Sequence, residues 1–126
     1  LVSSQQIPLY PGTGAASETG VGNIVNMPLT PGSGGKEFKA QWRTHGLTRM
    51  AAFKPNLILI SAGFDGHRDD PLSQLELLTA DYAWLTNEIV KISELTAAGR
   101  IISSLEGGYN LVALADACAA HVEALM

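Results

Sequence analysis

The feature that most constrains this chain is segment 56–70, where a short apolar run leads directly into an acidic loop. Residues 57–60 read Leu-Ile-Leu-Ile, which is too short for a helix and shows no alternation. An unbroken apolar run of this length is typical of a strand covered on both faces in a parallel sheet. Ligands of open α/β sheets bind beyond the carboxyl ends of the strands. We therefore expect any chemistry to involve Asp65, in the loop that follows.

The segments around this strand predict an alternation of strands and helices. Gly46 lies inside one predicted helix, where it costs about 1 kcal/mol relative to Ala. Thr79 is expected to cap a second helix, which Gly99 ends. The order of elements predicts βαβ units and a parallel sheet. Apolar spacing and turn residues place strands at 1–7, 23–29, 57–60 and 101–105, and helices at 36–53, from Thr79 to Gly99, and at 111–126.

Composition limits the kind of protein that this chain can be. Its 126 residues, 46% of them hydrophobic, suffice for one domain with a core. The net charge of −4 and the lack of a Lys/Arg run exclude direct nucleic-acid binding, and no apolar stretch approaches the roughly 18–20 residues of a membrane span. The single cysteine, Cys118, is expected to be a small buried residue. No signal peptide precedes the first strand, so we expect a cytoplasmic protein, either a piece of something longer or a chain that has lost an N-terminal part.

Two loops carry the residue types from which a reactive centre could be built. The first contains Asp65 and His67 with two further acids, and the second contains Glu106, two glycines and Tyr109. Because the loops follow neighbouring parallel strands, we expect them at the same edge of the sheet. Carboxylate and imidazole suit zinc and similar metals, and a tyrosine hydroxyl can donate a hydrogen bond to a developing oxyanion. This combination suits metal-assisted hydrolysis of an acyl bond.

These residues also have structural interpretations. The pair Asp69-Asp70 is typical of a loop or a capping position, and His67 of a solvent-facing loop residue. His121 is expected to be structural within the last helix. Tyr10, in a Pro/Gly loop, is either an exposed aromatic wall or a packed ring. Two glycine-rich stretches, 12–17 and 34–37, lack the residues that nucleotide-binding motifs require.

Four motifs, taken in order, resemble one known family. Residues 10–14 read Tyr-Pro-Gly-Thr-Gly, 25–29 read Val-Asn-Met-Pro-Leu, 61–65 read Ser-Ala-Gly-Phe-Asp, and 105–111 read Leu-Glu-Gly-Gly-Tyr-Asn-Leu. They resemble the zinc-dependent histone deacetylase superfamily, especially bacterial class II members such as acetylpolyamine amidohydrolases and acetoin-utilisation proteins. The resemblance implies a three-layer α/β/α fold with a parallel sheet. Residues 1–126 would then be a single partial domain, the C-terminal part of the arginase/deacetylase fold.

The resemblance also implies roles for individual residues. Asp65 matches the last zinc ligand of the family, and Tyr109 matches the tyrosine that polarises the acetyl carbonyl and stabilises the tetrahedral intermediate. Gly107 and Gly108 match glycines that line the acetyl-lysine channel. Tyr10 stands where the family has an aromatic wall of that channel. His67 would have no ligand role, and Asp70 would be a loop acid.

The chain departs from the family in what it lacks. A D-x-H motif and a tandem histidine pair supply the other zinc ligands and the general base in the family, and both lie upstream of the Pro-Gly-Thr-Gly loop. No His-His pair occurs here, and the only D-x-H is the accidental one at 65–67. We therefore expect zinc in the complete enzyme, and neither bound zinc nor deacetylase turnover in the isolated chain.

Two hypotheses follow for what the chain is. It is either the C-terminal part of a deacetylase that acts on acetyl-lysine or an acetylated small molecule, or an autonomous non-catalytic remnant. A sheet without its remaining strands would expose an unpaired edge and an apolar face, so we expect a homo-oligomer or a complementing chain.

Overall fold

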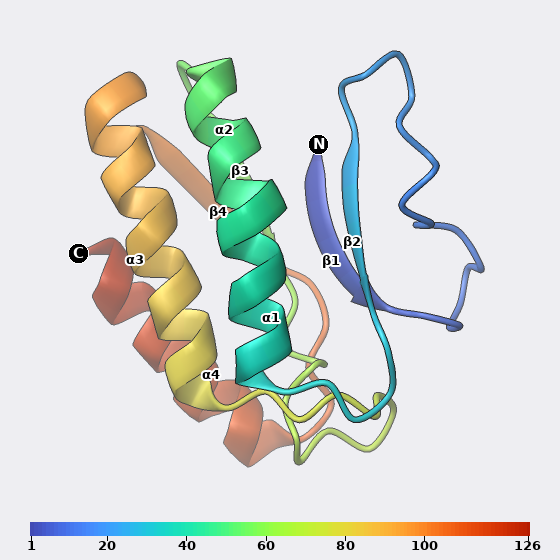
Figure 1. Cartoon of the computed structure of the whole chain (residues 1–126). Coiled ribbons are helices and arrows are strands. Elements are labelled where there is room, and N and C mark those ends of the chain that lie inside the picture. The colour runs from blue at the N-terminus through green and yellow to red at the C-terminus, as the bar shows by residue number, and fades with distance from the viewer.

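After two consecutive strands, helical segments and strands alternate along the chain, as the sequence predicts (Figure 1). The computed structural model describes all residues, 1–126. Each strand lies within two residues of its predicted bounds at both ends. No helix has the length and apolar character needed to cross a membrane. The elements are β1 (Val2–Gln6), β2 (Val25–Leu29), α1 (Gly35–Gln41), the π-helix η1 (Trp42–Gly46), α2 (Leu47–Phe53), β3 (Ile58–Ala62), α3 (Thr79–Thr96), β4 (Ile101–Leu105) and α4 (Leu111–Leu125).

The strands form two parallel pairs. β1 pairs with β2 and β3 pairs with β4, but no strand joins the two pairs. A cavity of about 1090 Å³ lies between them and is lined along the whole length of both β1 and β3. The side chain of Gln6, at the end of β1, accepts the backbone N–H of Gln74 at 2.7 Å. Since Gln74 belongs to the loop after β3, the carboxyl ends of both pairs meet at one edge.

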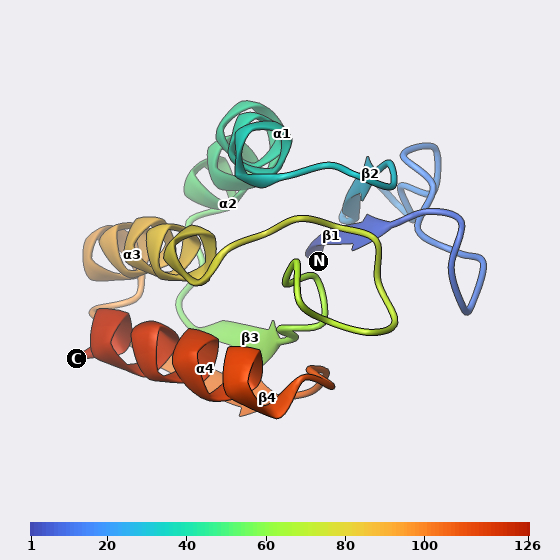
Figure 2. The same cartoon turned by 90° about the horizontal axis from the view of Figure 1, so that it is seen from below.

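The helices gather on one side of the strands (Figure 2). On β3 the side chains of Ile58 and Ala62 are buried, whereas Leu59 on the opposite face is 71% exposed. Ile102 of β4 is also exposed. The expectation that the central strand is covered on both faces is therefore wrong for this chain, because its helices supply only one covering layer.

Gly46 lies at the end of the π-helix that joins α1 and α2 into one helical segment. A Cβ atom on Gly46 would lie 2.5 Å from the ring atom Cε3 of Trp42 and 3.0 Å from Cε of Met27. Trp42 and Met27 are both buried core residues. The glycine that weakens the predicted helix is thus the residue that allows the Trp42 ring to pack.

The start of α3 differs slightly from the prediction. Thr79 is the first helical residue rather than the cap, and Leu78 occupies the N-cap position. The carboxylate of Asp81 accepts the backbone N–H of Leu78 at 2.9 Å and forms an ion pair with Lys39 Nζ at 2.6 Å. A leucine can stand at this N-cap because Asp81 supplies the acceptor from within the first turn.

His121 connects α3, β4 and α4 through a hydrogen-bond chain that is buried at Thr86 and reaches the exposed Ser103. The Thr86 hydroxyl donates to the carbonyl of Tyr82 at 2.8 Å, so its oxygen accepts the Nδ1–H of His121 at 2.7 Å. Nε2 of His121 then accepts the hydroxyl of Ser103 at 2.8 Å. Burial lowers the pKa of His121 below its usual value. The structural role expected for this histidine agrees with these contacts.

Candidate active site

Asp65 lies just beyond the carboxyl end of β3 and is half-buried. Burial raises the pKa of its carboxyl group, its own backbone N–H lowers it, and the negative charges of Asp70 and Glu106 raise it further. No cationic side chain forms an ion pair with it among the salt bridges of the chain. Asp65 is therefore a desolvated carboxylate in a negative environment, which suits a ligand for a cation.

The loop after β4 places Gly107 directly against this carboxylate. A Cβ atom on Gly107 would lie 2.5 Å from Oδ2 of Asp65, and the Gly107 carbonyl accepts the N–H of Phe64 at 2.7 Å. Gly108 has a φ of +143°, and a Cβ there would lie 2.7 Å from Cδ1 of Leu114. A side chain at either position would force Asp65 or Leu114 to move, so the close approach of the two loops depends on these glycines.

Tyr109 stands on the same edge, held by its backbone. Its N–H donates to Oδ2 of Asp70 at 2.9 Å, and its side chain is exposed. Tyr10 is 98% exposed, so the alternative of a packed ring is wrong. Tyr10 and Asp65 both line the cavity between the strand pairs. The structure therefore brings Asp65 and Gly107 into contact, ties Tyr109 to the neighbouring loop, and places Tyr10 at the same cavity.

His67 and Asp70, in the loop after β3, have contacts that the sequence did not predict. His67 is 6% exposed, and its Nδ1 accepts the N–H of Asp69 at 3.2 Å, so the prediction of a solvent-facing residue is wrong. The loop turns inward there because Arg68 N–H donates to the carbonyl of Leu77. Asp70 is a capping acid, as predicted, but its bond to Tyr109 went unforeseen. The Asp-Asp-Pro pattern indicates a turn and holds no signal for a partner 39 residues away.

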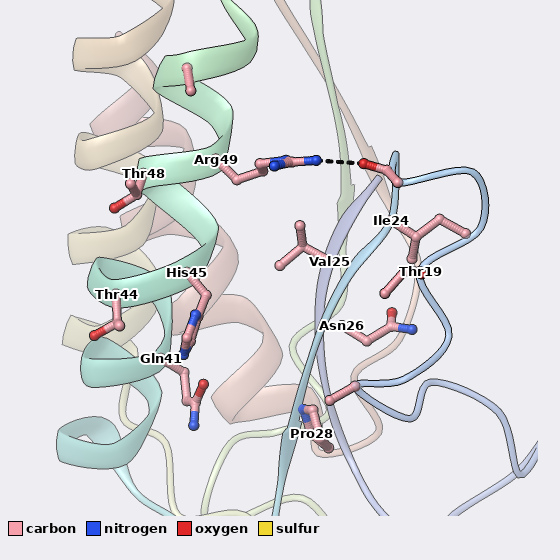
Figure 3. A pocket seen from close by; sticks show the side chains of 13 residues that line it. Thr19, Ile24, Val25, Asn26, Pro28, Gln41, Thr44, His45, Thr48 and Arg49 are labelled. Carbon is pink, nitrogen blue, oxygen red and sulfur yellow. Dashed lines mark hydrogen bonds between the residues drawn. The ribbon is translucent and has the colours of Figure 1, made fainter.

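A second cavity, of about 740 Å³, lies between β2 and the helical segment η1–α2 (Figure 3). His45 and Arg49 line it, but no carboxylate or cysteine does. The Arg49 guanidinium donates to the carbonyl of Gly22 at 2.5 Å across this space, as the dashed line in Figure 3 marks. His45 is thus the one side chain there that could act as a ligand or base, and it has no carboxylate beside it, so this cavity is a weaker candidate than the edge around Asp65.

The chain's own residues do not complete a zinc site. Catalytic zinc takes about three protein ligands and keeps an open position. No group of three His, Cys, Asp or Glu side chains in the structure could hold a metal ion. Asp65 fits the chemistry of one such ligand, and a catalytic zinc here would need further ligands beside it.

The chain belongs to the histone deacetylase family: the model of the histone deacetylase domain matches residues 2–125. An uncharacterized protein of Synechocystis is 38% identical over 98% of this chain, which corresponds to 40% of that protein. Histone deacetylase 14 of Arabidopsis thaliana is 37% identical over 99% of the chain and 30% of its own length. A probable deacetylase of Archaeoglobus fulgidus is 39% identical over 87% of the chain and 32% of its own length.

Solved structures agree on the fold. The HDA15 HD domain superposes with a TM-score of 0.90 at 33% identity, over 98% of this chain and 36% of that one. The acetylpolyamine aminohydrolase of Burkholderia pseudomallei superposes with a TM-score of 0.84 at 28% identity, over 98% and 36%. The α/β class with parallel strands and the deacetylase fold are thereby confirmed. The chain spans well under half the length of each of these proteins.

Proposed function

We propose that this chain is the C-terminal segment of a zinc-dependent deacetylase, with Asp65 as one ligand of the metal. The observation that carries the proposal is the Asp65 carboxylate, which is desolvated, lacks a cationic partner and lies against Gly107 at the carboxyl edge of β3 and β4. A side chain in this state destabilises the fold unless a cation binds it. Perturbed carboxylates of this kind concentrate at functional sites.

Tyr109 supplies the second element of the proposal. Its exposed side chain leaves the hydroxyl free to donate a hydrogen bond to a substrate oxygen. In this role Tyr109 stabilises the negative charge that forms on an acyl carbonyl during hydrolysis. In this proposal Gly107 and Gly108 line the acyl channel with their backbones, because Asp65 and Leu114 take up the space where their side chains would lie, and Tyr10 forms part of the wall. The substrate class is acetyl-lysine, an acetylpolyamine or a similar N-acyl amide.

The isolated chain is proposed to be inactive, because it has one of about three ligands that a catalytic zinc requires. The remaining ligands and a general base would come from residues outside this chain. The cavity between β1 and β3 supports this interpretation, since two strand edges and an apolar lining face it without a partner.

A second candidate is an autonomous, non-catalytic protein that folds as a homo-oligomer. The observation in its favour is the uncovered face of β3 and β4, where Leu59 and Ile102 are exposed. Burying this apolar face against a second copy would also protect the strand edges from aggregation. Light scattering separates this candidate from a monomer, and a monodisperse monomer contradicts it.

A chimera tests the enzyme proposal. This chain replaces the matching part of the HDA15 HD domain, whose structure superposes on 98% of it. We expect the chimera to bind zinc stoichiometrically and to hydrolyse an acetyl-lysine reporter, whereas the isolated chain does neither. Asp65→Asn should reduce zinc binding, and Tyr109→Phe should abolish turnover while leaving zinc bound.

The control is Tyr10→Phe in the same chimera, because it removes an exposed hydroxyl of the same type but keeps the aromatic ring that forms the wall. It should retain zinc and most of the turnover. A folded chimera that binds zinc but loses no activity in Tyr109→Phe contradicts the role given to Tyr109. Zinc binding that is unchanged in Asp65→Asn contradicts the role given to Asp65.

A further inference from the structure

Asp70 makes more hydrogen bonds than a loop acid needs. It is 7% exposed, and its Oδ1 accepts the N–H groups of Leu72 at 2.9 Å and Ser73 at 3.4 Å. These two bonds close the local turn and use one oxygen. The other oxygen, Oδ2, accepts the N–H of Tyr109 from the loop after β4 at 2.9 Å. The turn alone could be capped by a residue with one acceptor, such as Asn or Ser.

The second oxygen of Asp70 therefore serves the other loop. A buried carboxylate is costly unless its oxygens are hydrogen-bonded, and here three backbone N–H groups stabilise the charge. A parallel bond lies one residue further along, where the Asn110 amide donates to the carbonyl of Asp69 at 3.0 Å. Oδ1 of the same Asn110 accepts two N–H groups of the first turn of α4. Two hydrogen bonds to the loop after β3 therefore hold Tyr109 in place, one from its own N–H and one from the side chain of Asn110.

The Tyr109 side chain makes no hydrogen bond of its own within the chain and is more than half exposed. Its place on the edge is consequently set by the backbone that carries it. Gly108, with a φ of +143°, precedes it and offers little stiffness. The bond to Asp70 is the one charge-assisted contact made by the Tyr109 amide, and such bonds are roughly twice as strong as neutral ones.

We propose that Asp70 is a positioning residue that fixes the Tyr109 backbone, and with it the point from which the phenol extends, at the edge that carries Asp65. The catalytic consequence of this inference rests on the proposed function, but the hydrogen bond between Tyr109 and Asp70 can be tested without measuring activity. Asp70 acts through Tyr109 and does not touch the substrate. It differs from Asp65 in that its charge is fully used by backbone donors, which leaves it unavailable to a cation.

The isosteric variant Asp70→Asn isolates the cross-loop bond. An asparagine keeps one oxygen for the turn at Leu72 and Ser73 and places an NH₂ group against the Tyr109 N–H, donor against donor. We expect the Tyr109 amide to exchange with solvent about tenfold faster or more, the loss expected when a charge-assisted bond is broken. In fluorotyrosine-labelled chain, the Tyr109 signal should shift or broaden while the signal of Tyr10 stays in place.

The matched control is Asp69→Asn. The Asp69 side chain is 61% exposed, and the contact it provides to Asn110 comes from its backbone carbonyl, which the substitution retains. The control should leave the Tyr109 amide and its fluorine signal as in the unaltered chain. A Tyr109 amide equally protected in Asp70→Asn and Asp69→Asn overturns the proposal.

A measurement on the unaltered chain covers the case in which Asp70→Asn does not fold. A scalar coupling through the hydrogen bond, between the Tyr109 backbone nitrogen and the Asp70 carboxyl carbon, is expected in NMR spectra. Its absence overturns the proposal. In the active chimera, Asp70→Asn should lower kcat at least tenfold with KM nearly unchanged, and an unchanged kcat overturns the positioning role. A chimera that is inactive with Asp70 intact defeats the proposed function, while the amide and fluorine results still decide the contact.

Discussion

Gly107→Ala offers the most direct test of how the two loops meet. The added Cβ would lie 2.5 Å from Oδ2 and 2.8 Å from Cγ of Asp65, so the carboxylate must move aside. Forcing extra volume into such a contact costs about 1–3 kcal/mol. Gly107 is not among the residues of positive φ, so alanine also gains about 0.4–1 kcal/mol by restricting the unfolded chain. The net expectation is a destabilisation of about 0.5–2 kcal/mol.

The same substitution should change sign when the carboxylate is absent. In an Asp65→Ala background the nearest remaining atom is Cβ of residue 65, at 3.4 Å, which is close to an ordinary contact. Gly107→Ala should then be neutral or stabilise the chain by up to about 1 kcal/mol. The coupling free energy between the two positions is thus expected to be about 0.5–3 kcal/mol, the range found for residues in contact.

Urea unfolding of the four chains in this cycle, followed by circular dichroism, measures the coupling. The m-values must agree among the four chains, so that the differences report stability and not a change in the denatured state. If Gly107→Ala costs the same in both backgrounds to within about 0.5 kcal/mol, the two side chains are independent. That result would refute the placement of the Asp65 carboxylate over Gly107.

Four further predictions concern stability. Thr86→Val leaves the Nδ1–H of His121 without an acceptor and should cost about 1–3 kcal/mol in urea unfolding. Burial lowers the pKa of His121 in the folded chain below 6.5, its value in the unfolded chain. The contribution of neutral His121 to the free energy of unfolding is therefore complete above pH 6.5 and is lost as the pH falls below it. A Tm that stays constant from pH 7.5 to 5 contradicts this. Because burial raises the pKa of Asp65, the chain loses stability as the pH rises above 3.8, so Asp65→Asn should raise the Tm at pH 7 and not at pH 3. Gly46→Ala should lower the Tm although alanine favours helix, since its Cβ meets the Trp42 ring.

The elements that sequence patterns predicted well are those whose causes are local. The strand Ile101–Leu105 matches its predicted bounds, and α3 carries the apolar spacing of Tyr82, Leu85 and Ile89 on its packed face. Period and turn residues act within a few positions, so one sequence is enough to read them. The contact between the loops after β3 and β4 was also predictable, because parallel neighbours place their carboxyl ends together.

The features that were missed depend on residues far apart in the chain. His67 is buried because the loop pairs back against Leu77, which no local pattern indicates. The sequence indicates only that Gly46 weakens the helix, whereas the structure shows that it makes room for the ring of Trp42. The separation of the two strand pairs depends on what lies between β1 and β3, and composition carries no information about it. Each of these misses is a case in which tertiary packing overrides local propensity.

The three acids around the candidate site differ in how their charge is used. Asp70 is stabilised by three backbone N–H groups, and Glu106 is exposed to solvent. Asp65 has neither a set of donors nor full solvation, and the other two acids raise its pKa. This arrangement of acids does not stabilise the fold of the chain. With a cation bound to Asp65 the effect would be favourable, because each negative charge that now destabilises the Asp65 carboxylate would then attract the ion. Asp70 is therefore a carboxylate that holds the loops of this edge together, whereas Asp65 is a carboxylate that remains available to bind a cation there.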